Sequence, residues 1–156
     1  MIEILIPGYR KVQLKYLVMD YNGTMACDGN LIKGLEKILE ELSSKLEIHV
    51  LTADTFGKAK EELKKIPSLL SILPEDKQDE GKLEYVKNLG AKFSVCIGNG
   101  RNDRLMLKHS ELGIALIQEE GASAATIMSA DIVCKDILSA LKLLTIPKRL
   151  IATLRS

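Results

Sequence analysis

The chain has 156 residues, with 22 lysines and arginines against 21 aspartates and glutamates, for a net charge of +1. This length predicts a single domain, residues 1–156, with a sizeable core. The balanced charge argues against broad electrostatic binding to nucleic acid or to an anionic membrane. The sequence has no apolar run near the roughly 18 residues that span a bilayer, so no membrane association is expected. The three cysteines are widely spaced without a CxxC pair, which indicates reduced thiols and a cytoplasmic location.

Short apolar runs alternate with segments of helical periodicity along the whole chain. In chain order, we expect strands at Ile2–Ile6 and Tyr16–Met19, a helix at Leu31–Leu46, a strand at Ile48–Leu51, a helix at Phe56–Ile66 and a strand at Leu69–Leu73. A helix at Gly81–Leu89, a strand at Phe93–Ile97, a helix at Asp103–His109 and a strand at Gly113–Ile117 follow, then a helix at Ala122–Met128, a strand at Ile132–Cys134 and helices at Asp136–Leu144 and Pro147–Leu154. Such alternation predicts an α/β fold, with a parallel sheet covered by helices on both faces.

An aspartate ends the first strand of the predicted core. Asp20 follows the apolar run Leu17-Val18-Met19, and the turn Asn22-Gly23-Thr24 comes directly after it. Open α/β sheets bind their ligands at the carboxyl ends of strands, and the glycine lets a bulky anion approach the backbone. Alternatively, Asp20 is an ordinary turn residue.

Three further features fall near the same predicted edge of the sheet. Thr52 ends the next core strand, Lys82 lies in the helix before the following one, and Gly98-Asn99-Gly100-Arg101-Asn102-Asp103 comes directly after that strand. A strand-end carboxylate can attack phosphorus, a hydroxyl and an ammonium can hold phosphoryl oxygens, and a second carboxylate can help to bind Mg²⁺. Each feature also has an ordinary reading: Thr52 as a helix N-cap, Lys82 as a surface lysine, and the glycine-rich segment as a plain turn.

Together, these residues resemble the four motifs of the haloacid dehalogenase-like (HAD) superfamily of aspartate-nucleophile phosphotransferases. Asp20-Tyr21-Asn22-Gly23-Thr24 is similar to the first motif, Thr52 to the second, Lys82 to the third and Gly98–Asp103 to the fourth, usually written GDGxND. From Gly98 to Leu144 the chain is similar to the phosphorylation domain of P-type ATPases, and the nearest group is the soluble, stand-alone P-type ATPase-like proteins.

The resemblance implies a three-layer, Rossmann-like, doubly wound sheet and Mg²⁺-dependent phosphoryl transfer through Asp20. Only 28 positions separate Thr24 from Thr52, and 30 separate Thr52 from Lys82, so no sizeable cap domain is expected. An uncapped site favours a large phosphorylated substrate, a partner protein, or a neighbour in a homo-oligomer that acts as a lid. The implied residues are the following: catalytic, Asp20, Asn22, Thr52 and Lys82; substrate-binding, Gly23, Thr24, Ala53 and Asn102; metal-binding, Asp20, Asn22, Asn99 and Asp103.

Two departures from the family pattern bear on activity. Asn22 stands where phosphatases of the family usually have an aspartate that serves as general acid and base, and an amide cannot perform that proton transfer. Asn99 stands where the fourth motif usually has aspartate, which removes one carboxylate near the metal. Asp54 is a candidate to compensate, although a role in a surface loop is the alternative. The motif lysine is also open between Lys82 and Lys77, which follows Pro74.

Three functions fit this pattern. The first is a phosphohydrolase that turns over slowly because Asn22 is no base. The second is a non-catalytic phosphate-binding or phospho-accepting regulatory module, and the third is an interaction domain that kept the fold and lost the site.

Overall fold

The computed structural model describes residues 1–53 and 57–156. Asp54 and the start of the helix expected at Phe56–Ile66 lie outside the described residues. In the described part, no helix combines the length and the apolar character that crossing a membrane requires.

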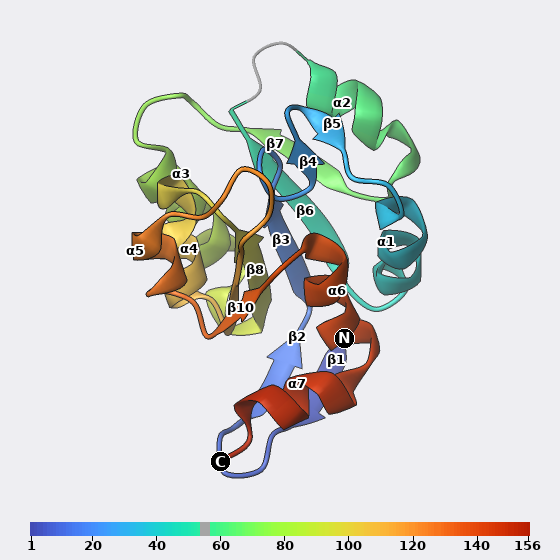
Figure 1. Cartoon of the computed structure of the whole chain (residues 1–156), viewed down its shortest axis with the longest axis vertical. Helices are drawn as coiled ribbons and strands as arrows, with labels where there is room; N and C mark the ends of the chain where they lie inside the picture. Colours follow the sequence, from blue (N-terminus) through green and yellow to red (C-terminus); the bar gives the residue numbers. More distant parts are fainter. Residues whose placement is uncertain (54–56) are drawn as a thin grey trace.

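The expected parallel sheet is confirmed, and it has six strands (Figure 1). The strand order is β10-β9-β8-β3-β6-β7, so the first strand of the sheet in sequence lies in its middle. From β3 the chain adds β6 and β7 on one side and then β8, β9 and β10 on the other, which makes a topological switch point between β3 and β8. The strands are β3 (Tyr16–Asp20), β6 (Glu47–Thr52), β7 (Leu69–Ile72), β8 (Ser94–Gly98), β9 (Leu112–Leu116) and β10 (Ile132–Cys134).

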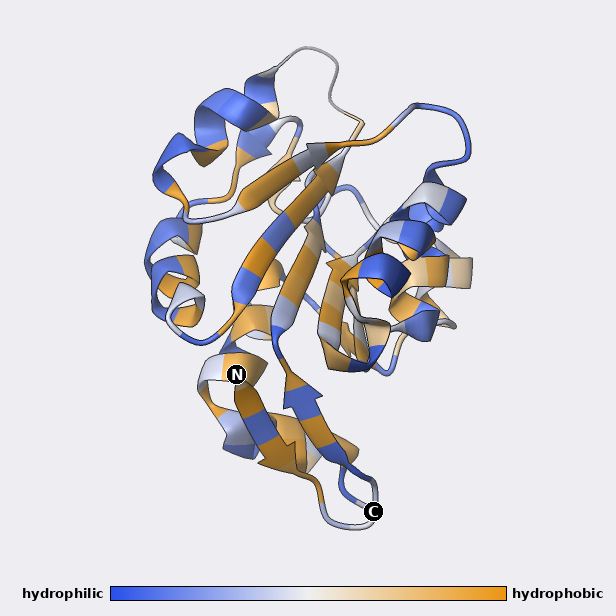
Figure 2. Cartoon of the chain, turned by 180° about the vertical axis from the view of Figure 1, so that it is seen from behind, coloured by the Kyte–Doolittle hydropathy of each residue, from blue (hydrophilic) through white to orange (hydrophobic). Residues whose placement is uncertain are grey.

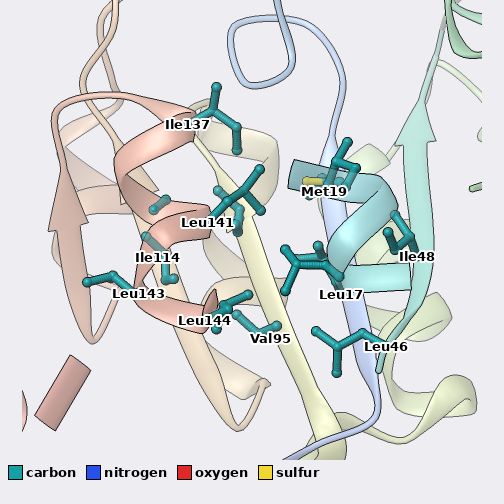
Figure 3. Close-up of a cluster of buried hydrophobic side chains, with 14 of the residues drawn as sticks. Leu17, Met19, Leu46, Ile48, Val95, Ile114, Ile137, Leu141, Leu143 and Leu144 are labelled. Atoms are coloured by element: carbon teal, nitrogen blue, oxygen red, sulfur yellow. The ribbon is translucent and has the colours of Figure 1, made fainter. Parts of the chain in front are cut away.

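Helices cover both faces of the sheet and make three layers. Along β3, Leu17 and Met19 point into the core under α1 and α6 (Figure 3), while Val18 packs with residues of α3 and α4 on the opposite face. This alternation follows from the two-residue period of a strand. Figure 2 shows the strands as mostly hydrophobic and the surrounding helices as mixed. The helices are α1 (Leu35–Ser43), α2 (Lys58–Glu62), α3 (Gln78–Leu89), α4 (Arg104–His109), α5 (Ala124–Ile127), α6 (Ile137–Thr145) and α7 (Pro147–Leu154), and the 3₁₀ turns are η1 (Leu63–Lys65), η2 (Ala91–Phe93) and η3 (Arg101–Asp103).

A separate antiparallel hairpin, β1 (Ile2–Leu5) and β2 (Lys11–Leu14), extends below the main sheet and packs against α7 (Figure 1). The strand expected at Ile2–Ile6 is present as β1. Its partner β2 was not expected, although Val12 and Leu14 are buried on one face of it.

The helix was expected from Leu31 to Leu46, but α1 begins only at Leu35. Leu31 instead pairs with Ala26 in a second small hairpin, β4 (Ala26–Cys27) and β5 (Asn30–Leu31). Gly34 then adopts φ 91°, and α1 starts only after it. In the described residues this two-stranded hairpin is the insertion between β3 and α1, so no large cap covers the sheet edge. Other boundaries move by a few residues: α3 begins at Gln78, and α5 is shorter than the segment Ala122–Met128.

Candidate active site

Asp20 is the last residue of β3, the strand next to the switch point. Four of the five β3 residues are buried, and Asp20 itself is only 6% exposed. A carboxylate therefore lies at the edge of the core, where an open α/β sheet forms its ligand crevice.

Lys82 joins two carboxylates beneath this crevice. Its Nζ donates to Asp20 Oδ1 and to Asp103 Oδ1, each at 2.6 Å. Lys82 reaches this position from the first turns of α3 and is 1% exposed. The other candidate lysine, Lys77, precedes α3 with an exposed side chain that lies 4.0 Å from Glu80. Of the two lysines, Lys82 is the one in contact with the carboxylate cluster.

Asp103 organises the turn after β8. Its Oδ2 accepts from the backbone N–H of Asn99 at 3.0 Å and of Gly100 at 2.9 Å, while its Oδ1 accepts from Lys82. A Cβ at Gly98 would collide with the Asp103 carboxylate, so this position requires glycine. Both Asp103 oxygens are thus engaged within the protein.

The Asn99 side chain also bonds within the protein. Its Oδ1 accepts from Thr24 Oγ1 at 3.4 Å, and its Nδ2 donates to the Gly121 carbonyl at 3.0 Å. Gly23, at φ 77°, packs so closely on this amide that a Cβ there would overlap it. The loop after β3 and the loop after β8 are therefore in direct contact through Asn99.

A pocket of about 490 Å³ opens above Asp20. Five residues of the predicted site line it: Asp20, Asn22, Thr52, Ala53 and Asn102. The others are buried and are not among the lining residues: Gly23, Thr24, Lys82, Asn99 and Asp103. The structure adds lining residues that the sequence reasoning missed: Tyr21, Asp28, Gly29, Lys58, Glu75 and Gln78.

The pocket wall is polar and internally bonded. Asn102 Nδ2 donates to Gln78 Oε1 at 2.6 Å, and Lys58 Nζ donates to Asn30 Oδ1 at 3.1 Å. These contacts join the turn after β8 to α3, and α2 to the β4–β5 hairpin. No feature of the local sequence links such partners, because they meet only in the folded chain.

Burial and the neighbouring Asp103 raise the pKa of Asp20 to about 7, although Lys82 acts in the opposite direction. For Lys82, burial disfavours the charged form, but the two carboxylates outweigh burial and raise its pKa. The cluster thus holds one ammonium between two carboxyl groups, and its oxygen-rich, net negative character suits a hard cation such as Mg²⁺. Lys82 takes one of the two Asp20 oxygens, Oδ1, and the exposed Asn22 lines the pocket beside Asp20.

Known proteins resemble this chain in sequence or in fold. No family model matches the sequence. The chain is 56% identical over 72 residues to an uncharacterized protein of Methanocaldococcus jannaschii, a match that covers 46% of this chain and 77% of that protein. It is also 27% identical over 128 residues to cation-transporting ATPase 5 of Schizosaccharomyces pombe, which covers 82% of this chain but only 10% of the ATPase.

Solved structures share the fold at low identity. The 3-deoxy-D-manno-octulosonate 8-phosphate phosphatase of Moraxella catarrhalis, in complex with magnesium, phosphate and KDO, superimposes with a TM-score of 0.67 at 18% identity, over 91% of this chain and 94% of that one. The cobalt-bound deoxy-D-mannose-octulosonate 8-phosphate phosphatase of Haemophilus influenzae superimposes with a TM-score of 0.72 at 12% identity, over 92% of this chain and 94% of that one. The chain therefore belongs to one family with the Methanocaldococcus jannaschii protein, and its fold is that of the haloacid dehalogenase-like superfamily.

Proposed function

We propose that this protein is a Mg²⁺-dependent phosphohydrolase that acts through an aspartyl-phosphate on Asp20. The observation that carries the proposal is the buried Lys82 ammonium held between Asp20 and Asp103, directly beneath an open polar pocket at the switch point of the sheet. The phosphatases that share the fold, one of them in complex with magnesium and phosphate, support the same reaction class.

In the first step, an Asp20 carboxylate oxygen attacks phosphorus, a bond from Asp20 to phosphorus forms, and the bond to the leaving oxygen breaks. Because Asn22 is no acid, the leaving alkoxide takes its proton from water. Lys82 neutralises charge on the nucleophile and on the phosphoryl group, and the Thr52 hydroxyl at the end of β6 orients a phosphoryl oxygen. A bound Mg²⁺ would supply further charge neutralisation at these oxygens. Asp20 and Asn22 would hold the ion from the pocket, while Asp103 would act through Lys82 and the turn after β8.

In the second step, water attacks the phosphorus of the aspartyl-phosphate and releases Asp20. The Asn22 side chain is exposed at the pocket wall, but an amide has no lone pair basic enough to accept the proton of that water. We therefore propose that the intermediate is hydrolysed slowly. The uncapped pocket admits a small polar alcohol as the leaving group and also leaves room for a larger phosphorylated substrate or a partner protein.

The test is a phosphatase assay on a broad panel of phosphomonoesters, with Mg²⁺ and with EDTA. We expect turnover that requires Mg²⁺ and that Asp20→Asn abolishes. Asp131→Asn serves as the matched carboxylate-to-amide control, because Asp131 bonds to the backbone N–H of Gly113, away from the pocket. Turnover that survives Asp20→Asn would refute the proposed nucleophile.

A phospho-accepting regulatory module is the second candidate, and the amide at Asn22 is the observation that favours it. This candidate predicts that the protein binds beryllofluoride together with Mg²⁺, that Asp20→Asn blocks this binding, and that no ester of the panel is turned over. Sustained turnover that depends on Asp20 would exclude it.

A further inference from the structure

Gln118 makes three hydrogen bonds between the nucleophile loop, residues 20–24, and the start of α6. It lies two residues after β9 and is half-buried. Its Nε2 donates to the carbonyl oxygens of Gly23 and Thr24, each at 3.0 Å. Its Oε1 accepts from the backbone N–H of Ile137 at 2.9 Å. One side chain thus ties the nucleophile loop to a helix that belongs to the core.

These partners also fix which way the amide points. The two carbonyl oxygens require a donor, and the N–H of Ile137 requires an acceptor. The reverse orientation would place an oxygen against two carbonyls and an NH₂ group against an N–H. Only an uncharged amide of this length satisfies all three groups at once.

The same segment holds the second loop of the site. Gly121 accepts from Asn99 Nδ2 through its carbonyl, and the Ser123 N–H donates to the Asn99 carbonyl at 2.9 Å. Residues 118–123 therefore contact the loops after β3 and after β8. These two loops carry Asp20 and Asp103, so this segment is placed to set their relative position.

We propose that Gln118 is a positioning residue that sets the nucleophile loop for phosphoryl transfer; the inference rests on the proposed function. Within the loop, the Gly23 N–H bonds to the Ala26 carbonyl, and Gln118 adds the side-chain bonds that tie the Gly23 and Thr24 carbonyls to the start of α6. Because a displacement of about 1 Å at a reacting group can cost on the order of 100-fold in rate, loss of these two bonds should act on kcat.

The test compares Gln118→Met, which removes the donors, with Gln118→Glu, which also places a charge against the two carbonyls. Asp136→Ala is the matched control. Asp136 caps the same end of α6 by accepting from the Ser139 N–H at 2.6 Å, and it has no hydrogen bond to the nucleophile loop among those described. We expect both Gln118 variants to lower kcat by about tenfold or more, with KM changed by less than about threefold.

The control separates positioning from stability. Asp136→Ala should lower the melting temperature as much as Gln118→Met does, with kcat of the folded protein unchanged. If Gln118→Met keeps kcat within about twofold of the wild type, or if Asp136→Ala lowers kcat equally, the positioning role is wrong.

Backbone amide exchange tests the inference apart from turnover. The Gly23 N–H donates to the Ala26 carbonyl and the Thr24 N–H to the Tyr21 carbonyl, so both are protected in the folded loop. Gln118→Met should speed exchange at these two amides, whereas Asp136→Ala should not. If the wild type hydrolyses no ester, the proposed function fails, and unchanged exchange in Gln118→Met would separately overturn the positioning role.

Discussion

Replacing Lys82 with methionine should destabilise the protein far more than a typical surface substitution does. Lys82 is 1% exposed, and its Nζ lies 2.6 Å from a carboxylate oxygen of Asp20 and from one of Asp103. Methionine fills a similar volume but leaves both carboxyl groups buried without a cation. Removing one partner of a buried ion pair typically costs about 3–5 kcal/mol, and we expect Lys82→Met to lower the free energy of unfolding by that amount at pH 7.

The assay is urea unfolding followed by circular dichroism in Mg²⁺-free buffer. Lys77→Met is the control, because Lys77 is exposed and should change the free energy of unfolding by no more than about 0.5 kcal/mol. The double variant Lys82→Met/Asp20→Asn should recover part of the loss, since an amide at position 20 needs neither a cation nor a bound proton to be buried there. Equal midpoints for Lys82→Met and Lys77→Met would refute the reasoning that the buried ammonium holds the cluster together.

Two further predictions concern the nucleophile loop. Burial and Asp103 raise the pKa of Asp20 to about 7, so the folded state binds this proton more tightly than the unfolded state, and stability is lost as the pH rises toward 7. In urea unfolding without Mg²⁺, the free energy of unfolding of Asp20→Asn should therefore rise relative to that of the wild type by roughly 1–3 kcal/mol between about pH 4 and 7. Parallel pH curves for the two proteins would contradict this prediction. Asn22→Asp supplies a base at the pocket wall and should raise the turnover of an aryl phosphate by about tenfold or more; no gain in an active protein would refute the assigned effect of Asn22.

The sequence predicted the parts of the fold that depend on local pattern. Buried strands such as β3 and β8 contain short apolar runs that end in turn residues, a local pattern that predicts strands. Strand β2 and the β4–β5 hairpin were missed because each depends on contacts outside its own segment. β2 has only two inward residues, Val12 and Leu14, and it needs β1 and α7 to bury them. Leu31 fits the period of α1, but pairing with Ala26 and the positive φ of Gly34 end that pattern.

The candidate site likewise has residues that the sequence predicted and residues whose role depends on distant parts of the chain. The sequence predicted that three residues of the site lie close together, because their segments fall at one edge of the sheet: Asp20, Lys82 and Asp103. The structure confirms the contact of Lys82 with both carboxylates. Gln118 follows the carboxyl end of β9, so the same rule could have pointed to it. Its role could not be predicted, since it depends on two backbone carbonyls nearly a hundred positions earlier in the chain.

Asn22 and Asn99, the two departures from the motif pattern, have different surroundings, so a change to aspartate should have different consequences at the two positions. Asn99 uses both ends of its amide, accepting from Thr24 and donating to the Gly121 carbonyl. A carboxylate there would place an oxygen against that carbonyl, so the loops around Asn99 are built for an amide, and restoring aspartate would not simply restore a metal ligand. The Asn22 side chain is exposed at the pocket wall instead, where a change of chemistry disturbs few packed atoms. If Asp20 is phosphorylated as proposed, position 22 is therefore where a substitution can change how fast the intermediate is hydrolysed without disturbing the packing of the site.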